Sequence, residues 1–150
     1  MKFLCSRIWH VPDEPDPFLD GALWCFHTWE RRQWPWFLLT QGDTLYLLHR
    51  GLGQITWETR VRQVKRCAYT SRRTALGILE EWTEGRRESA PSILRSAPAT
   101  GSLLAFECVP KRQLAIPRPR WLSLPRTGWV RDPNLIDRAL AAPTSRKMAS

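Results

Sequence analysis

The stretch GDTLYLLHRGLGQITWETRV (residues 42–61) contains two apolar runs separated by a turn with two glycines. A Gly-Asp pair leads into the first run, and the glycine-containing turn precedes the second run at 54–64. Successive side chains of a strand point to opposite faces, so the second run predicts one buried face and one charged face. The expected buried set is Ile55, Trp57, Thr59 and Val61, and the expected charged set is Thr56, Glu58, Arg60 and Arg62. The stretch therefore predicts a central antiparallel hairpin.

Further elements are expected on both sides of this hairpin. Residues 2–9 predict a strand, and the prolines that follow predict an irregular loop because they fix φ and lack a backbone N–H. Residues 21–37 are rich in aromatics, and their first half has the spacing of a short helix that Pro35 would end. The later elements are a helix at about 74–84, a loop at 86–101, strands at 102–110 and 113–117, and a helix opened by Asp132 and Pro133.

Together these elements predict an α+β protein. The expected architecture is a small mixed or antiparallel curved sheet, or an open β-barrel, with flanking helices. A chain of 150 residues suits one domain, which we place at 1–140 and expect to be followed by a disordered tail at 141–150. The apolar content of 43% and the nine tryptophans are typical of a packed core.

The net charge of +9 is unevenly distributed along the chain. Residues 1–30 carry five acids and two cations, for a net charge of −3, so the remainder carries +12. Nineteen of the 23 cations are arginines, which suit bidentate phosphate contacts and stacking on bases. This charge favours a nucleic-acid partner, RNA or DNA, over an anionic membrane surface or a role in solubility alone.

The cysteines and histidines do not indicate a metal or cofactor site. Cys5, Cys25, Cys67 and Cys108 are far apart and lack the spacing of zinc or redox motifs, so we expect buried, reduced thiols. The histidines also lack metal-ligand spacing. Neither a signal-peptide pattern nor an apolar run of membrane-spanning length is evident, so we expect a cytoplasmic protein with no cofactor and no membrane contact.

The central segment resembles the EVE domains of the PUA-like superfamily. In that family a Gly-Asp turn leads into a strand that ends in a Tyr-His-Ser-like triplet. Here Leu48, His49 and Arg50 occupy those positions, so the histidine matches and its two neighbours differ. The segment RWLSLP at 120–125 is similar to the family's Arg-Leu-Ser-x-x-Pro with one residue inserted, and Trp129 follows it. The resemblance covers about residues 2–130.

This resemblance implies a fold, related to those of ASCH, YTH and SRA readers, that holds one base, usually a modified one, between aromatic rings. Residue chemistry supports the same function, because aromatic side chains replace the stacking that an extruded base loses and cations hold its phosphates. We therefore expect a non-catalytic nucleic-acid-binding module that acts with an effector protein. Base stacking is assigned to Trp9, Trp24, Trp29 and Trp34, base-edge contacts to Ser6, Asp43 and His49, and phosphate contacts to Arg50, Arg60, Arg62, Lys65 and Arg66.

Two other functions remain open. Asp43 and Glu58 have the spacing of acids on adjacent strands of a metal-dependent nuclease, although such sites usually carry lysine where Arg60 stands. A protein-interaction adaptor would instead use the acidic N-terminal loop or the loop at 86–101 as its contact surface.

Overall fold

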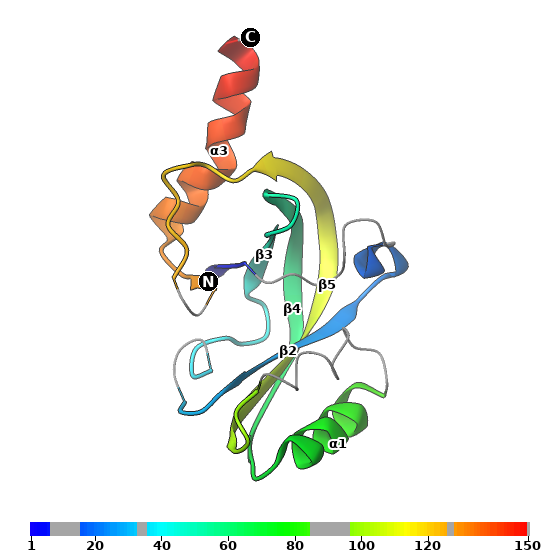
Figure 1. Ribbon diagram of the computed structural model, residues 1–150. Coiled ribbons are helices and arrows are strands. Elements are labelled where there is room, and N and C mark those ends of the chain that lie inside the picture. The colour runs from blue at the N-terminus through cyan, green and yellow to red at the C-terminus, as the bar shows by residue number, and fades with distance from the viewer. Residues whose placement is uncertain (7–15, 33–35, 85–96, 126–127, 150) are drawn as a thin grey trace. The chain divides into compact units, whose positions relative to one another are not determined.

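The structure, a computed structural model, describes residues 1–6, 16–32, 36–84, 97–125 and 128–149, which form one six-stranded sheet and flanking helices (Figure 1). The strands are β1 (Lys2–Cys5), β2 (Leu23–Trp29), β3 (Thr44–His49), β4 (Gln54–Tyr69), β5 (Gly101–Pro117) and β6 (Trp129–Val130). The helices are the 3-10 helix η1 (Pro17–Asp20) and the α-helices α1 (Arg72–Thr83) and α3 (Pro133–Ala149). The sheet order is β2-β5-β4-β3-β1-β6, with β1 parallel to β3 and antiparallel to β6. The predicted α+β class with a mixed sheet is therefore confirmed.

The contacts of the chain divide it into two compact units. Unit 1 comprises Met1–Glu14, Gly42–Arg60 and Pro110–Ser150, and unit 2 comprises Pro15–Gln41 and Val61–Val109. Strands β4 and β5 supply residues to both units, whereas the other strands and the two α-helices each belong to one of them. The single domain over 1–140 stays a prediction.

The core of unit 1 forms between its strands and α3. Strand β1 pairs in parallel with β3, from Lys2↔Thr44 to Cys5↔Leu47, and α3 lies beside β1 (Figure 1). Apolar side chains from β1, β3, β4, β6 and α3 meet in one buried cluster. Its members are Leu4, Tyr46, Leu48, Ile55, Leu122, Val130, Ile136 and Ala139.

A β-bulge changes the face on which Ile55 lies. Leu47 pairs with Trp57, but Leu48 pairs with Ile55, so Thr56 is an extra residue in β4. Paired residues share a face, and Ile55 therefore lies on the side of Leu48, in the core of unit 1. The sequence prediction that Ile55 and Trp57 share one face is wrong, because regular alternation does not allow for the inserted residue.

Helix α3 begins where the sequence predicts. The Asp132 carboxylate accepts a hydrogen bond from the Asn134 backbone N–H at 2.9 Å, and Pro133 is the first helical residue. The helix continues to Ala149, so the backbone is helical over 141–149, within the segment 141–150 that we expected to be a disordered tail. Among the described helices, none is both long and apolar enough to cross a bilayer.

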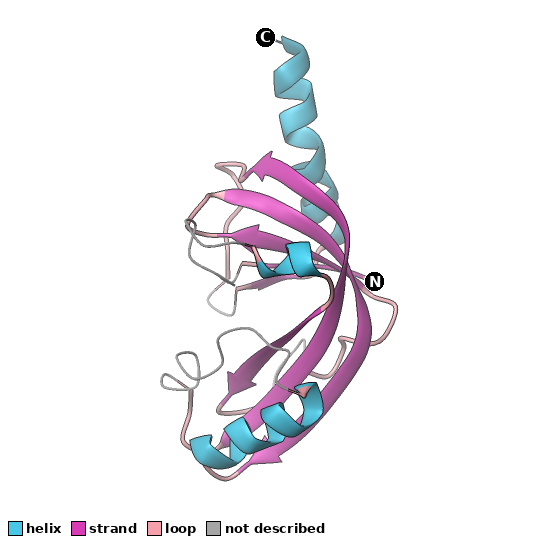
Figure 2. Ribbon diagram, turned by 90° about the vertical axis from the view of Figure 1, so that its right-hand side faces the viewer, coloured by secondary structure: helices cyan, strands magenta, loops and turns pink. Residues whose placement is uncertain are grey.

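Unit 2 contains α1 packed against the sheet (Figure 2). Helix α1 begins after Ser71, whose hydroxyl accepts a hydrogen bond from the Thr74 N–H at 3.1 Å. Both ends of the helix lie within two residues of the predicted range of about 74–84. Apolar residues of α1 meet side chains of β2, β4 and β5 in a second buried cluster. Its members are Trp24, Phe26, Tyr69, Ala75, Leu79, Ala97, Leu103 and Ala105.

Two predictions along β2 and β5 are wrong. The short helix expected in the first half of 21–37 is β2, which pairs with β5 from Leu23↔Cys108 to Trp29↔Ser102. Seven residue pairs with β5 outweigh the weak helical spacing of this segment. The two strands expected at 102–110 and 113–117 are one strand, because pairing with β2 stops at Cys108 and the missing N–H of Pro110 removes no bond to β2.

The four cysteines are free thiols. Cys5, Cys25 and Cys108 are buried, and Cys67 is half-buried, where burial raises the pKa of its thiol. Burial of reduced thiols is thus confirmed for three of the four positions.

The close approach of β5 to β2 predicts that Gly101→Ala destabilises the protein. A Cβ at this position would lie 2.2 Å from the Trp29 carbonyl oxygen, so the paired backbones must separate. We expect a loss of about 1–3 kcal/mol in the free energy of unfolding, measured by urea denaturation.

The matched control is Gly77→Ala on the exposed side of α1, where an added Cβ meets nothing within 4 Å. This substitution should raise stability by up to about 1 kcal/mol, because alanine is the better helix former. Equal stability of the two variants would contradict the close approach at Gly101.

Candidate nucleic-acid interface

The positive charge of the protein is concentrated in unit 1. This unit contains thirteen lysines and arginines and six acids, for a net charge of +7, whereas unit 2 contains ten and eight, for a net charge of +2. A phosphate backbone is attracted most strongly to the surface with the largest local excess of cations. Unit 1 is therefore the part of the chain that best suits a polyanion.

Ser6 and Arg50, two of the predicted site residues, are in contact in unit 1. The Arg50 guanidinium donates to the Ser6 hydroxyl at 3.1 Å, and that hydroxyl donates to the Gly128 carbonyl at 3.1 Å. The Ser6 backbone N–H donates to the same carbonyl at 2.7 Å, and Ser6 is 1% exposed. Gly128 has a φ of +78°, and a Cβ there would lie 3.1 Å from the Ser6 hydroxyl. These contacts join the ends of β1 and β3 to the segment before β6.

His49 and Asp43 are buried and have partners within the chain. His49 Nδ1 accepts a hydrogen bond from the Leu52 N–H at 3.2 Å, and the His49 carbonyl accepts one from the Gly53 N–H at 2.9 Å. Asp43 accepts a hydrogen bond from the Met1 ammonium at 3.0 Å. In this structure both side chains stabilise the turns that flank β3, and their predicted contacts with a base edge stay a prediction.

The predicted stacking residues that the structure describes are buried. Trp24 is 6% exposed and Trp29 is 5% exposed, both in unit 2. The Lys65 ammonium lies 5.6 Å from the centroid of the Trp24 ring, and the His27 ring lies 4.3 Å from that of Trp29. Packed in this way, neither indole presents a face to a base. Trp9 and Trp34 lie outside the described residues.

The predicted phosphate-binding cations of β4 have different surroundings. The Arg66 guanidinium donates to the carbonyls of Trp36 and Leu39, and burial lowers its pKa. Arg62 pairs with Glu107 at 2.6 Å, and this carboxylate raises the pKa of Arg62. The structure thus gives Arg66 a structural role, because it satisfies backbone groups of the segment after β2.

This difference predicts that Arg66→Ala destabilises the protein more than Arg62→Ala does. Loss of the Arg66 guanidinium leaves two carbonyls without their charged donor, which should lower the free energy of unfolding by about 1–3 kcal/mol. Arg62 is solvent-exposed, and its ion pair should contribute little. Urea denaturation of both variants measures the difference, and equal losses would contradict the structural role of Arg66.

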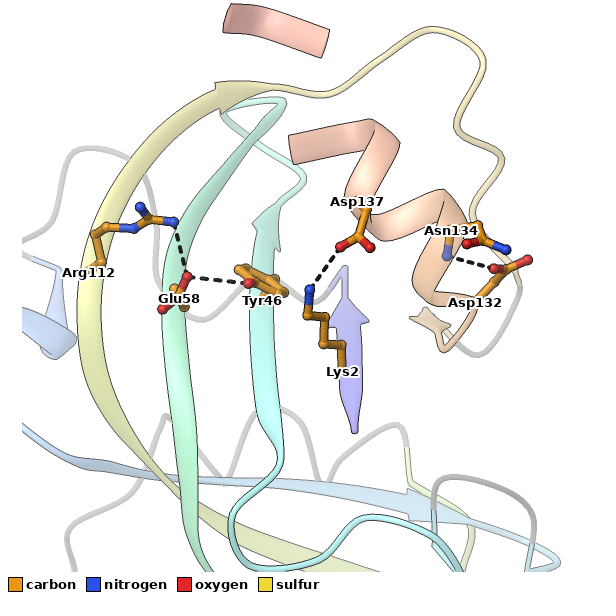
Figure 3. Close-up of polar contacts among 7 residues, drawn as sticks. All are labelled: Lys2, Tyr46, Glu58, Arg112, Asp132, Asn134 and Asp137. Atoms are coloured by element: carbon orange, nitrogen blue, oxygen red, sulfur yellow. Dashed lines mark hydrogen bonds and ion pairs between the residues drawn. The ribbon is translucent and has the colours of Figure 1, made fainter. Parts of the chain in front are cut away.

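A chain of polar contacts crosses unit 1 from β5 to β3 (Figure 3). The Glu58 carboxylate accepts hydrogen bonds from the Arg112 guanidinium at 3.0 Å and from the Tyr46 hydroxyl at 3.3 Å. Nearby, the Lys2 ammonium donates to Asp137 of α3 at 2.9 Å, and this contact raises the pKa of Lys2. These contacts link β5, β4 and β3 to one another and β1 to α3.

The two acids of the nuclease hypothesis each have a cation of the chain as partner. Asp43 pairs with the Met1 ammonium, and Glu58 pairs with Arg112. Within the described ranges, no three side chains of His, Cys, Asp or Glu form a group that could hold a metal ion. Both carboxylates are occupied by cations of the protein itself.

The chain has two tyrosines, and their surroundings predict a late ionisation of both. Burial, followed by the charge of Glu58, raises the pKa of Tyr46 above its ordinary value of 10.0, and burial also raises that of Tyr69. The folded state then holds both protons more tightly than the unfolded state does. This stability is present below pH 10 and is lost as the pH rises through the folded pKa values.

Tyrosinate absorbance during an alkaline titration measures this effect. The folded protein should ionise above pH 10, Tyr46→Phe should halve the amplitude, and the protein in concentrated urea should titrate near the ordinary value. Two tyrosines that ionise near pH 10 in the folded protein would contradict the predicted pKa shifts.

The sequence assignments omitted an exposed basic surface in unit 1. Lys111 and Arg112 are exposed on β5, and Arg120 and Trp121 are exposed in the segment that follows it. The alternation of proline and arginine at 117–120, next to a tryptophan, was a signal for an exposed basic turn.

Comparisons with known proteins identify the fold of the chain. No family model matches it, and a search of curated proteins also gives no match. Two solved structures are similar, both of ZmASCH mutant proteins from Zymomonas mobilis, one with tyrosine replaced by phenylalanine and one with serine replaced by alanine. The first has a TM-score of 0.60 and 12% identity and covers 94% of this chain and 96% of that chain. The second has a TM-score of 0.59 and 11% identity, with 95% of each chain covered.

This likeness concerns the fold, because the identity is low while nearly the whole of both chains is aligned. ZmASCH is an ASCH domain with a PUA-like fold, and the fold expected from the sequence is consistent with it. The assignment to EVE domains in particular stays a prediction. The chain has an α+β, PUA-like fold.

Proposed function

We propose that this protein is a nucleic-acid-binding module and that unit 1 provides the contact surface. The observation that carries the proposal is the net charge of +7 on unit 1, against +2 on unit 2. Neutralised phosphates release their counterions, so a local excess of cations supplies binding energy without any sequence-specific contact. The PUA-like fold supports the same class of partner, because the family resemblance implies a base of RNA or DNA as the ligand.

Three exposed cations of unit 1 are the principal phosphate contacts in this proposal. Arg60 lies on β4, Lys111 lies on β5, and Arg120 lies in the segment after β5. None of them forms an ion pair with another described residue, so a phosphate meets no competing carboxylate from the described part of the chain. Arg60 retains its predicted role, whereas Arg62 and Arg66 have partners within the chain.

The finer predictions concern the identity of the bound base, the effector partner, the location in the cell and the absence of catalysis. A pocket for a modified base would need aromatic faces beyond those of Trp24 and Trp29, which are packed in unit 2. An effector protein as partner, a cytoplasmic location and the absence of catalysis stay predictions of the sequence. The adaptor hypothesis differs from our proposal in a measurable way, since it requires no affinity for nucleic acid.

The salt dependence of binding tests the proposal. We expect labelled single-stranded RNA, single-stranded DNA or duplex DNA to bind at about 50 mM salt, with an affinity that falls steeply as salt is added. The double variant Arg60→Ala/Lys111→Ala should reduce the slope of log K against log salt by about 1.4–1.8, the share of two phosphate contacts. Fluorescence anisotropy of the labelled strands measures this slope.

The control variant Arg31→Ala/Arg73→Ala removes the same charge from exposed positions of unit 2. It should change the slope much less, because its cations lie outside the proposed surface. Equal effects of the two double variants would show that only the total charge matters and would exclude an interface on unit 1. A protein that binds none of the strands at low salt would refute the proposed function.

A further inference from the structure

A hydrogen-bonded turn in unit 1 places Arg120 and Trp121 at its two corners. The Leu122 N–H donates to the Pro119 carbonyl at 3.1 Å, which closes a four-residue β-turn. The Leu122 side chain is 1% exposed and belongs to the core of unit 1, so the base of the turn is fixed. Both corner residues are exposed. The turn therefore presents a cation and an indole on a firmly attached support.

Arg118, the residue before the turn, forms two hydrogen bonds that hold the turn in place. Its backbone N–H donates to the Gly53 carbonyl at 2.9 Å, which connects the turn to the hairpin of β3 and β4. Its guanidinium donates to the Leu122 carbonyl at 2.9 Å. A turn held at three points loses little conformational entropy when a ligand binds to it.

The exposed indole is combined with a second cation from α3. The Arg138 Cζ lies 4.3 Å from the centroid of the Trp121 ring, within the range of a cation–π contact. Trp121 is 41% exposed, and it is the one exposed tryptophan among those that the structure describes. Burying an indole is favourable by a few kcal/mol, so an indole left exposed on a rigid turn is consistent with a ligand that covers it.

The charge around Trp121 indicates the chemistry of that ligand. The sequence from 110 to 131 contains six cations and no acid. A neutral apolar partner would have to desolvate these cations without compensation, whereas a polyanion pairs with them. An indole with the Arg138 guanidinium against its ring and Arg120 next to it in the turn therefore fits a ligand that carries both a planar ring and a phosphate.

We propose that Trp121 and Arg138 form a stacking platform for one base of a single-stranded nucleic acid, with Arg120 on a neighbouring phosphate. This inference rests on the proposed function and names the site within unit 1. A single strand fits better than a duplex, because its bases are free to leave their neighbours and stack on an aromatic ring. Stacking on the ring is independent of base identity, so RNA and DNA strands should both bind.

A comparison of base-containing and abasic oligonucleotides tests the platform directly in the full-length protein. Labelled oligo(dT), oligo(U) and an abasic deoxyribose strand of equal length carry the same number of phosphates, and the abasic strand differs from oligo(dT) only in its missing bases. The wild-type protein should bind the base-containing strands about 5- to 100-fold more tightly than the abasic strand. Trp121→Ala should abolish that preference, and Trp121→Phe should retain part of it.

Two further variants separate stacking from charge and from general aromatic exposure. Arg138→Lys keeps the charge but loses the planar guanidinium, so it should reduce the preference for bases more than the salt slope. Phe37→Ala removes another exposed aromatic, which is 60% exposed in unit 2, and should change neither quantity. Thermal melting confirms that each variant is folded.

The outcomes distinguish the two proposals. Salt-dependent binding that is equally tight for abasic and base-containing strands would overturn the stacking platform while the proposed function stands. The stacking platform would also be overturned if Trp121→Ala retained the full preference for bases. It would be overturned as well if a duplex of equal length bound as tightly as the single strand to both the wild-type protein and Trp121→Ala. A wild-type protein that binds no strand at low salt would overturn both.

Discussion

The constraint on which the structure depends is that two long strands must each serve two hydrophobic cores. β4 supplies Ile55 to the core of unit 1 and Tyr69 to the core of unit 2, and β5 likewise contributes residues to both units. Burial is needed at both ends of β4, and exposed Arg60 and Arg62 lie between them. These two arginines are thus placed where neither core requires an apolar side chain.

Many polar residues that suggest function in the sequence stabilise the fold in the structure. Ser6 joins the ends of two strands to the Gly128 carbonyl, and His49 accepts a hydrogen bond inside its own turn. Arg66 satisfies backbone carbonyls, and its burial fits that role. A buried polar group needs partners whatever the protein does, so such residues are expected at strand ends and turns. Among the residues that the structure describes, the candidates that remain are exposed cations and the exposed indole of Trp121.

The sequence predicted the central hairpin, α1, the start of α3 and the α+β class, because each depends on local patterns of apolar residues, caps and turns. It did not predict β2, since pairing over the length of that strand with β5 is a long-range effect that helical spacing cannot reveal. The same limit applied to the tryptophans. Trp24 and Trp29 lie near charges and prolines in the sequence, but β-pairing buries them. The sequence alone does not assign a role to Trp121, because its exposure depends on a turn anchored by Leu122 and Arg118. Proximity in the sequence suggested a class of partner, whereas the location that we propose depends on exposure, which only the structure reveals.

The extra residue in β4 also affects how this chain should be compared with others. On the N-terminal side of Thr56 the face that bears Leu48 carries Ile55, and on its C-terminal side the same face continues at Glu58, not at Trp57. A pattern with a constant period of two will align one half of the hairpin and misplace the other. A relative that lacks the bulge would need a one-residue gap at this point, inside a strand where gaps are normally penalised. Searches that permit a break at Thr56 should therefore detect similarities that an uninterrupted strand pattern obscures.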